Sequence, residues 1–258
     1  MAKPVTDFYD NLSPEYRDNM GWDWESTMRK EGESLARFVA NVAGKSSPFS
    51  VLDCSCGIGT QAIGLALLGN QVHATDLSTV SIDCARQEAK NLGATMTFGI
   101  ADFRELEASI SDTFDVVLSC DNSIAHCLQD EDLDAATTSM KARLNPGGLL
   151  LISFRDYDAL VVDKLRFNNE HVDDRPDGRR IVFQLWDWAS DGGSYRNSQF
   201  LIKETDGNYE VKHFETELRA LLRDELMAAI KNAGFADIRW HAPEDSGYYQ
   251  PIVTARSQ

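Results

Sequence analysis

Basic residues are scarce in this chain. Its 25 lysine and arginine residues face 41 aspartate and glutamate residues, which gives a formal charge of −16. A protein this acidic repels a phosphate backbone unless it carries a local basic patch, and no long lysine/arginine cluster is present. We therefore expect no nucleic-acid partner and a small-molecule substrate instead.

Long apolar runs are also missing. None approaches the ~18 residues that a membrane-spanning helix needs. The opening segment, MAKPVTDFYDNLS, has no apolar signal core. These absences predict a cytoplasmic protein without a membrane partner.

The cysteines do not form the pattern of a disulfide framework or a metal site. Their number is odd: Cys54, Cys56, Cys84, Cys120 and Cys127. Without an export signal, such a set predicts buried thiols. One residue between Cys54 and Cys56 is poor spacing for zinc, and no second Cys/His pair lies nearby. We expect no metal.

Short apolar runs alternate with segments of helical periodicity along most of the chain. The expected strands are 49–55, 71–78, 95–103, 113–120, 147–154, 236–242 and 249–256. The expected helices are 25–43, 60–70, 79–93, 130–144 and 221–235. This alternation predicts a single α/β domain over residues 1–258, with a Rossmann-like, doubly wound, seven-stranded sheet. The sheet is expected to be mostly parallel, with an antiparallel last strand.

Two further segments depart from this alternation. Between residues 156 and 220, the stretches SDGGS and TDGN are hairpin-turn signals, because glycine and Asn/Asp tolerate positive φ. They predict an antiparallel β insertion that forms part of an acceptor site. Residues 1–45 are expected to form a helical lid.

The stretch VLDCSCGIGTQA predicts a nucleoside site. Gly57 and Gly59 follow a strand and open a helix, and Asp76 ends the next strand. Glycines allow close approach of a ligand to the helix N-terminus, and an acidic residue at that strand end can accept hydrogen bonds from ribose hydroxyls. A tight turn without a ligand is the alternative interpretation of the glycines.

The glycine motif alone does not exclude a dinucleotide, because Ala62 is a permitted third residue. Asp53 precedes the glycines, and a carboxylate there would repel a pyrophosphate and favour a cationic sulfonium. S-adenosylmethionine is therefore favoured over NAD. The Tyr-x-x-x-Lys spacing of one group of NAD-dependent oxidoreductases does not stand out after the fourth or fifth strand.

Four segments together resemble the class I S-adenosylmethionine-dependent methyltransferases. They are VLDCSCGIGT, HATDLS, IADF and LNPGGLLLISF. Three others, FYDNLSPEYRDNM, CDNSIAHCL and SFRDYDAL, are similar to segments of the glycine N-methyltransferase and glycine/sarcosine methyltransferase group. The resemblance covers essentially the whole chain and implies S-adenosyl-L-methionine as cofactor.

The resemblance also implies roles for individual residues. Tyr16 and Arg29 would hold the methionine carboxylate, and Ser55 would offer backbone to the same end of the cofactor. Asp102 and Phe103 would meet adenine, where the family has an Asn-Trp pair. The complete predicted cofactor set is Tyr16, Trp24, Arg29, Asp53, Ser55, Gly57, Gly59, Asp76, Leu77, Asp102, Phe103, Cys120 and His126.

The predicted catalytic set is His126, Asn122 and Arg155. By the resemblance, Asn122 and Arg155 face the acceptor, and Arg155 holds a carboxylate. A local ion pair with Asp156 or Asp158 is the alternative for Arg155.

A nitrogen acceptor is preferred, namely an amino acid, an amine or an N-heterocycle. A neutral nitrogen needs no strong base, whereas an alcohol or phenol does. Two alternatives stay open: an O-methyltransferase with His126 as base, and a non-catalytic nucleoside-binding subunit. The sequence also leaves a homo-oligomer open.

Overall fold

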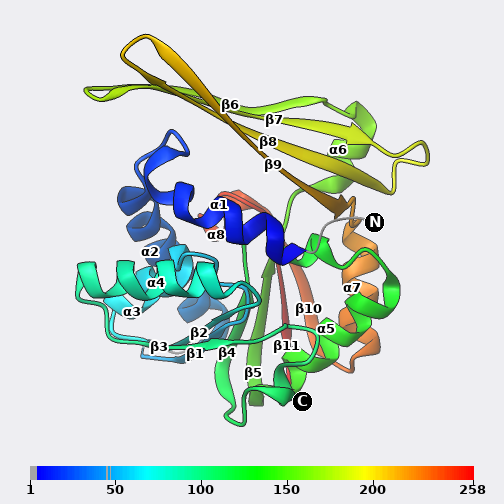
Figure 1. Ribbon diagram of the computed structural model, residues 1–258. Coiled ribbons are helices and arrows are strands. Elements are labelled where there is room, and N and C mark those ends of the chain that lie inside the picture. Colours follow the sequence, from blue (N-terminus) through cyan, green and yellow to red (C-terminus); the bar gives the residue numbers. More distant parts are fainter. Residues whose placement is uncertain (1–4, 45, 47) are drawn as a thin grey trace.

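The computed structural model describes residues 5–44, 46 and 48–258. A seven-stranded sheet with helices on both faces forms the body of the molecule, and a separate four-stranded sheet lies beyond one end of it (Figure 1). Helix α1 (Val5–Asn19) lies between the two sheets. Among the described residues, no helix is both long and apolar enough to cross a membrane. The cytoplasmic location stays a prediction.

The large sheet has the predicted topology. Its strands are β1 (Ser50–Asp53), β2 (Gln71–Asp76), β3 (Thr97–Ile100), β4 (Phe114–Ser119), β5 (Leu144–Ser153), β10 (Ala236–His241) and β11 (Ile252–Arg256). They are ordered β10-β11-β5-β4-β1-β2-β3, and β11 runs antiparallel to both neighbours. The strand order reverses between β1 and β4. In open α/β sheets, ligands bind at the carboxyl ends of strands at such a reversal.

Helices cover both faces of this sheet. They are α2 (Trp24–Ala43), α3 (Thr60–Leu67), α4 (Thr79–Leu92), α5 (Asp130–Ala142) and α7 (Arg223–Asn232), with shorter turns η1 (Leu106–Ala108), η2 (Ser123–His126), α6 (Tyr157–Asp163) and α8 (Pro243–Ser246). Along β1, Val51 packs with α2 and α3, whereas Leu52 packs with α5 and α7. Both faces of the strands are buried, which explains their continuous apolar sequence.

The predicted antiparallel insertion is present. Its strands are β6 (Phe167–Arg175), β7 (Gly178–Trp188), β8 (Ser194–Thr205) and β9 (Asn208–Arg219), paired in that order. The turn signals SDGGS and TDGN form the β7–β8 and β8–β9 connections, with positive φ at Gly192 and Gly207.

Helix α1 is held on two sides. Its Phe8 and Leu12 pack with Val182, Leu201 and Phe214 on the insertion. On the opposite side, Ser13 and Ser81 of α4 share a hydrogen bond of 2.7 Å, and the Arg17 guanidinium pairs with Glu88 at 3.1 Å. Of the segment 1–45, the structure describes residues 5–44, which form α1 and α2 with a short connection; residues 1–4 and 45 lie outside the description. The opening and closing of this segment as a lid stays a prediction.

Helices α2 and α3 cross at a pair of glycines. A Cβ added at Gly64 would lie 2.6 Å from the Met28 carbonyl oxygen and 2.9 Å from the Gly32 Cα. Backbone thus touches backbone, and the crossing brings Glu31 within 2.7 Å of the Gln61 amide. Because Gly32 and Gly64 have no side chains, the two helices come close enough for Glu31 and Gln61 to form this hydrogen bond.

We expect Gly64→Ala to lower the free energy of unfolding by about 1–3 kcal/mol, because the added methyl overpacks rigid backbone. This corresponds to a melting temperature lower by about 3–10 °C in a chain of this size. Gly193→Ala is the matched control, since an added Cβ there would lie 3.6 Å from Oδ1 of Asp191, at ordinary contact distance. Equal melting temperatures for the two variants in calorimetry would contradict the glycine contact.

Candidate active site

Two cavities meet under α1 at the carboxyl ends of the parallel strands. The small cavity has a volume of about 300 Å³ and lies against β1, β2 and β3. The large cavity, of about 1040 Å³, extends from there between α1, α2 and the inner face of the insertion. The residues that line both cavities are Tyr9, Tyr16, Thr60, Gln61, Asp121 and His126. These shared residues mark where a group could pass from one cavity to the other.

The two motif glycines have different structural roles. Gly57 lines the small cavity with φ of 52°, and the position of its missing Cβ is open space. A ligand can therefore approach its backbone closely. Gly59 has φ of 93° and precedes α3, and a Cβ there would lie 2.8 Å from Ile63. Gly59 permits the tight turn, while Gly57 keeps the cavity floor free.

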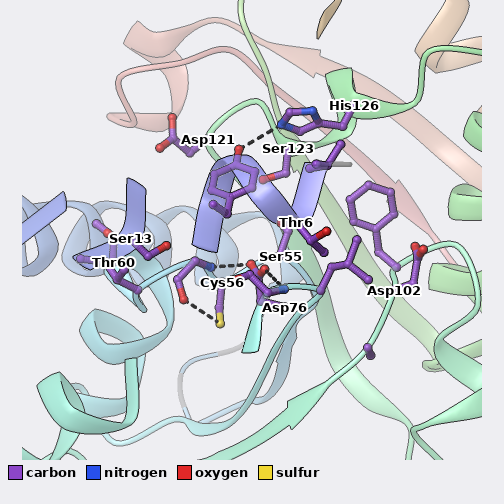
Figure 2. Close-up of a pocket in the computed structure, with 18 of the residues that line it drawn as sticks. Thr6, Ser13, Ser55, Cys56, Thr60, Asp76, Asp102, Asp121, Ser123 and His126 are labelled. Atoms are coloured by element: carbon purple, nitrogen blue, oxygen red, sulfur yellow. Dashed lines mark hydrogen bonds between the residues drawn. The ribbon is translucent and has the colours of Figure 1, made fainter. Parts of the chain in front are cut away.

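Asp76 is oriented by backbone donors at the end of β2. Its Oδ2 accepts a 2.8 Å hydrogen bond from Gly57 N, and its Oδ1 accepts one of 2.9 Å from Ser78 N. Figure 2 shows the Asp76 side chain beside Ser55 and Cys56 at the floor of the pocket. Burial raises the pKa of Asp76, although these backbone bonds lower it. The carboxylate is thus fixed in place before a ligand binds.

The far wall of the small cavity comes from the ends of β2 and β3. Leu77, Asp102 and Phe103, all members of the predicted cofactor set, line it. Asp102 pairs with Arg104 at 2.6 Å. Burial raises the pKa of the Asp102 carboxyl, but the Arg104 guanidinium lowers it by more. The net pKa is therefore below the ordinary value.

Helix α1 supplies the roof with one face. Tyr9, Ser13 and Tyr16 all line the small cavity, and their spacing of four and three residues places them on one side of a helix. The Tyr9 hydroxyl lies 3.0 Å from Nε2 of His126. Burial and the charge of Arg155 lower the pKa of His126 to about 4. His126 is therefore neutral at pH 7.

Asp121 lies at the junction of the cavities and was not predicted. It lies two residues beyond the end of β4, after Cys120, and its φ of 56° turns the side chain toward the pocket. Oδ2 accepts a 3.3 Å hydrogen bond from Tyr16, and Oδ1 accepts one from Tyr249. Figure 2 places Asp121 and His126 on the opposite side of the pocket from Asp76. The strand-end rule that found Asp76 could also have found this residue.

Asn122 and Arg155 lie together in the large cavity. The Asn122 amide donates to Tyr157 at 3.0 Å, and its Oδ1 accepts from the Arg155 backbone at 3.1 Å. The Arg155 guanidinium donates to Tyr195 at 2.8 Å and lies 4.9 Å from the ring centre of Trp186. The Asn122 side chain thus holds the Arg155 backbone and the Tyr157 hydroxyl, in addition to lining the cavity predicted for the acceptor.

The alternative ion pair for Arg155 is not formed. Asp156 pairs with Arg223 at 3.9 Å, and Asp158 accepts from the Arg223 backbone. Within the described part of the chain, no carboxylate lies at ion-pair distance from Arg155. Its guanidinium therefore faces the large cavity with a charge that a ligand could use.

Two predicted cofactor residues lie elsewhere. Arg29 is on the exposed face of α2, where it pairs with Glu25 one turn earlier at 2.7 Å, and it lines neither cavity. Trp24 lines the large cavity rather than the small one, and its Nε1 donates to Thr60 at 2.9 Å. Arg29 therefore cannot hold the cofactor carboxylate in this conformation.

Asp53 and Cys120 are buried behind the site. Asp53 is 0% exposed beneath Ser55, and desolvation raises the pKa of its carboxyl to about 8. The carboxyl is then mostly protonated at pH 7, so its expected repulsion of a pyrophosphate is not available. Cys120 is buried and lines neither cavity, although the residues that follow it do.

Residues 51–148 match a family model described as a methyltransferase domain. The glycine/sarcosine N-methyltransferase of Parasynechococcus marenigrum is 27% identical over 196 residues, which cover 70% of this chain and 66% of that protein. Residues 51–148 are thus a methyltransferase domain, and the fold of the described chain is that of the class I S-adenosylmethionine-dependent methyltransferases, to which its sequence is similar.

Other relatives widen the comparison. A ubiquinone biosynthesis O-methyltransferase of Chromobacterium violaceum is 30% identical over 114 residues, covering 44% of this chain and 46% of that protein. The sugar N-methyltransferase KedS8 of Streptoalloteichus has a TM-score of 0.77 at 16% identity, over 100% of this chain and 96% of that one. This last likeness shows the fold alone. The chain matches 56 to 66% of the length of three glycine/sarcosine N-methyltransferases.

The small cavity fits S-adenosylmethionine, the cofactor of this class. Asp76 ends β2 at the place where such folds bind ribose, Phe103 offers a flat apolar wall, and the Gly57 backbone is open to close approach. Of the residues predicted at the nucleoside end, Gly57, Asp76, Asp102 and Phe103 line this cavity, whereas Gly59 does not. Of the residues predicted at the methionine end, Tyr16, Ser55 and His126 line the small cavity, whereas Arg29 and Cys120 do not.

Asp76→Ala is expected to weaken S-adenosylmethionine binding by about 2–3 kcal/mol, because charge-assisted hydrogen bonds to the ribose are lost. Asp83→Ala, an exposed aspartate on α4 outside both cavities, is the control. Titration calorimetry on both folded variants measures the difference. Unchanged affinity in the Asp76 variant would remove the ribose assignment.

Proposed function

We propose that this methyltransferase transfers a methyl group to the nitrogen of a small-molecule amine. The observation that carries the proposal is Asp121, a carboxylate held by Tyr16 and Tyr249 where the two cavities meet. A carboxylate at the transfer point attracts an ammonium group and places its nitrogen there. It has no comparable attraction for a neutral alcohol.

The charge of the large cavity also favours a cationic acceptor. Four carboxylates and two basic side chains line it, not counting histidines: Glu31, Asp121, Asp156 and Glu170 against Lys30 and Arg155. A protonated amine is attracted into such a site. Arg155 in addition supports binding of a carboxylate on the same molecule, because its guanidinium fork matches a carboxylate. An amino acid is therefore one suitable acceptor.

Glu31 is suited to receive the proton that an ammonium must lose before it can attack. Burial raises the pKa of its carboxyl from 4.5 to about 7, with a further rise from the charge of Asp121. A base of pKa near 7 is better matched to an amine than an ordinary glutamate, so proton transfer costs less free energy. The 2.7 Å bond from Gln61 keeps its carboxylate in position.

The cofactor, when bound, supplies an electrophilic methyl group. Tyr9, Tyr16 and Asp121 orient the acceptor nitrogen at the junction of the cavities, and Glu31 takes its proton. The walls formed by α1 limit the access of water. Positioning of this kind accounts for much of the rate in a direct transfer, which needs the nucleophile near 3 Å from the reacting carbon.

Oxygen methylation has less support from the site. One relative is named as an O-methyltransferase, and in an O-methyl transfer His126 would act as the base. With a pKa of about 4, however, His126 is a weak base for an alcohol. The names of the glycine/sarcosine relatives agree with a nitrogen acceptor.

A labelled-methyl screen tests the proposal across amino acids, amines, N-heterocycles, phenols and alcohols. We expect label on nitrogen, identified by mass spectrometry of the product. Label on a phenol or alcohol alone would overturn the nitrogen assignment. Binding of S-adenosylmethionine without any transfer would favour a non-catalytic nucleoside-binding subunit.

We predict that Asp121→Asn lowers kcat/KM for an amine acceptor about 10- to 100-fold, the equivalent of ~1.5–3 kcal/mol for a hydrogen bond to a charged group. Asparagine tolerates the left-handed backbone at this position, so the loop should be retained. Asp112→Asn, in the exposed loop before β4, is the control. An amine acceptor whose kcat/KM stays the same in the Asp121 variant would contradict this role.

A pH profile tests Glu31. The residue must be ionised to accept a proton, so kcat/KM should rise as pH increases through about 7 and level off above it. The side chains that also act on this pKa are Asp121, Gln61 and Tyr248 from neighbouring elements and Lys30 from the same helix. In Glu31→Gln the rise near pH 7 should disappear and kcat should fall.

Glu33→Gln is the matched control for Glu31→Gln, because Glu33 is exposed on the same helix and lines neither cavity. Its pH profile should follow the unmodified protein. A rise near pH 7 that survives in Glu31→Gln would assign it to another group.

A further inference from the structure

The inner face of the insertion changes its chemistry along the strands. Beneath α1 it is apolar, with Val182, Leu201 and Phe214 packed against the helix. The next inward positions carry amides, Gln184 on β7 and Gln199 with Asn197 on β8. Inward positions of an antiparallel sheet are ordinarily apolar, because an amide without a partner is costly to bury. The amides face the large cavity, where α1 does not cover the sheet.

Gln184 has its hydrogen bonds satisfied within the protein. Its Nε2 donates to Gln199 Oε1 at 2.6 Å. Its Oε1 accepts from Asn169 and from Trp186 Nε1, both at 3.0 Å. The hydrogen bond to Gln199 Oε1 fixes the plane of the Gln199 amide, and Gln199 is the last residue of this network.

Two buried polar atoms beyond the network have no hydrogen-bond partner among the described residues. They are Nε2 of Gln199 and Oδ1 of Asn197, on side chains that are 2% and 4% exposed. Both side chains line the large cavity. A buried polar atom that is left without a hydrogen-bond partner destabilises the protein. The pair offers one donor and one acceptor on the same face of one strand, two residues apart.

We propose that Asn197 and Gln199 form a subsite for a hydroxyl group on the body of the acceptor. This rests on the proposed function, since it takes the large cavity as the acceptor site. A hydroxyl both donates and accepts, so it can satisfy either amide, and neither amide carries a charge that would select an ion. The carboxylate clamp at Arg155 and the ammonium contact at Asp121 leave this neutral face for a third part of the molecule.

The size of the cavity agrees with an acceptor that has such a body. Its volume of about 1040 Å³ is at the upper end of the ~300–1,000 Å³ range of ligand pockets. An acceptor of only a few heavy atoms would leave most of this volume, and the amides of β8, without contact. We therefore expect a hydroxylated amine to be preferred over glycine.

Matched probes test the subsite: cyclohexylamine and the set of 2-, 3- and 4-aminocyclohexanols. Their binding is measured by calorimetry on the protein saturated with S-adenosylhomocysteine, and their methylation with labelled cofactor. At least one aminocyclohexanol should bind about tenfold more tightly than cyclohexylamine. Asn197→Leu and Gln199→Met, both close in shape to the original residues, should reduce that advantage to less than about threefold. Cyclohexylamine affinity should stay unchanged in both.

Gln71→Met is the control, because Gln71 is exposed on β2 and lines neither cavity. Melting temperatures verify that each variant is folded. The subsite is overturned if no aminocyclohexanol binds more tightly than cyclohexylamine, or if the advantage survives both substitutions.

The identity of the methylated product distinguishes failure of the hydroxyl subsite from failure of the proposed N-methyl transfer. Equal N-methylation of cyclohexylamine and of the aminocyclohexanols would keep the nitrogen assignment and reject the subsite. If an aminocyclohexanol binds more tightly than cyclohexylamine only in the unmodified protein, and the label is found on oxygen, the subsite is kept and the nitrogen assignment is rejected.

Discussion

Helix α1 is packed between two sheets, and both cavities take a wall from it. Its apolar side rests on Val182, Leu201 and Phe214 of the insertion, and Ser13 binds Ser81 of α4 on the other side. The side chains it places between these contacts are the ones that roof the small cavity and mark the junction. Without this helix, the carboxyl ends of the parallel strands would form an open crevice. The enclosed volume and the contact of Tyr16 with Asp121 both follow from its position.

A second constraint lies in the backbone after β4. Asp121 and Asn122 have φ of 56° and 68°, a left-handed conformation that costs non-glycine residues about 1–2 kcal/mol each. The two side chains consequently point to different places. Asp121 faces the junction of the cavities, while Asn122 turns back to hold the backbone at the end of β5. Strain in this turn is offset by three hydrogen bonds to the two residues' side chains from Tyr16, Tyr249 and the Arg155 backbone.

Sequence reasoning predicted the large sheet correctly and named Gly57 and Asp76, which line the small cavity, because both depend on local patterns. A glycine turn after one strand and an aspartate after the next define Gly57 and Asp76 without knowledge of distant contacts. Glu31 was missed because only the glycine crossing of α2 and α3 brings it to Gln61. Arg29 was misplaced because the side of α2 that faces the site is set by that same crossing. The amides of β7 and β8 gave no signal, since alternation along a strand does not say which face is turned inward.

The placement of α1 also has a consequence for how the chain folds. Asn19 accepts a hydrogen bond from Arg180, a contact that spans 161 residues. The helix is synthesised well before its apolar partners Leu201 on β8 and Phe214 on β9. Contacts of such high sequence separation form slowly, because loop closure must precede them. The helix that roofs the cofactor cavity therefore gains its full set of apolar contacts only after β9 has been made, later than the parallel strands that form the floor of that cavity.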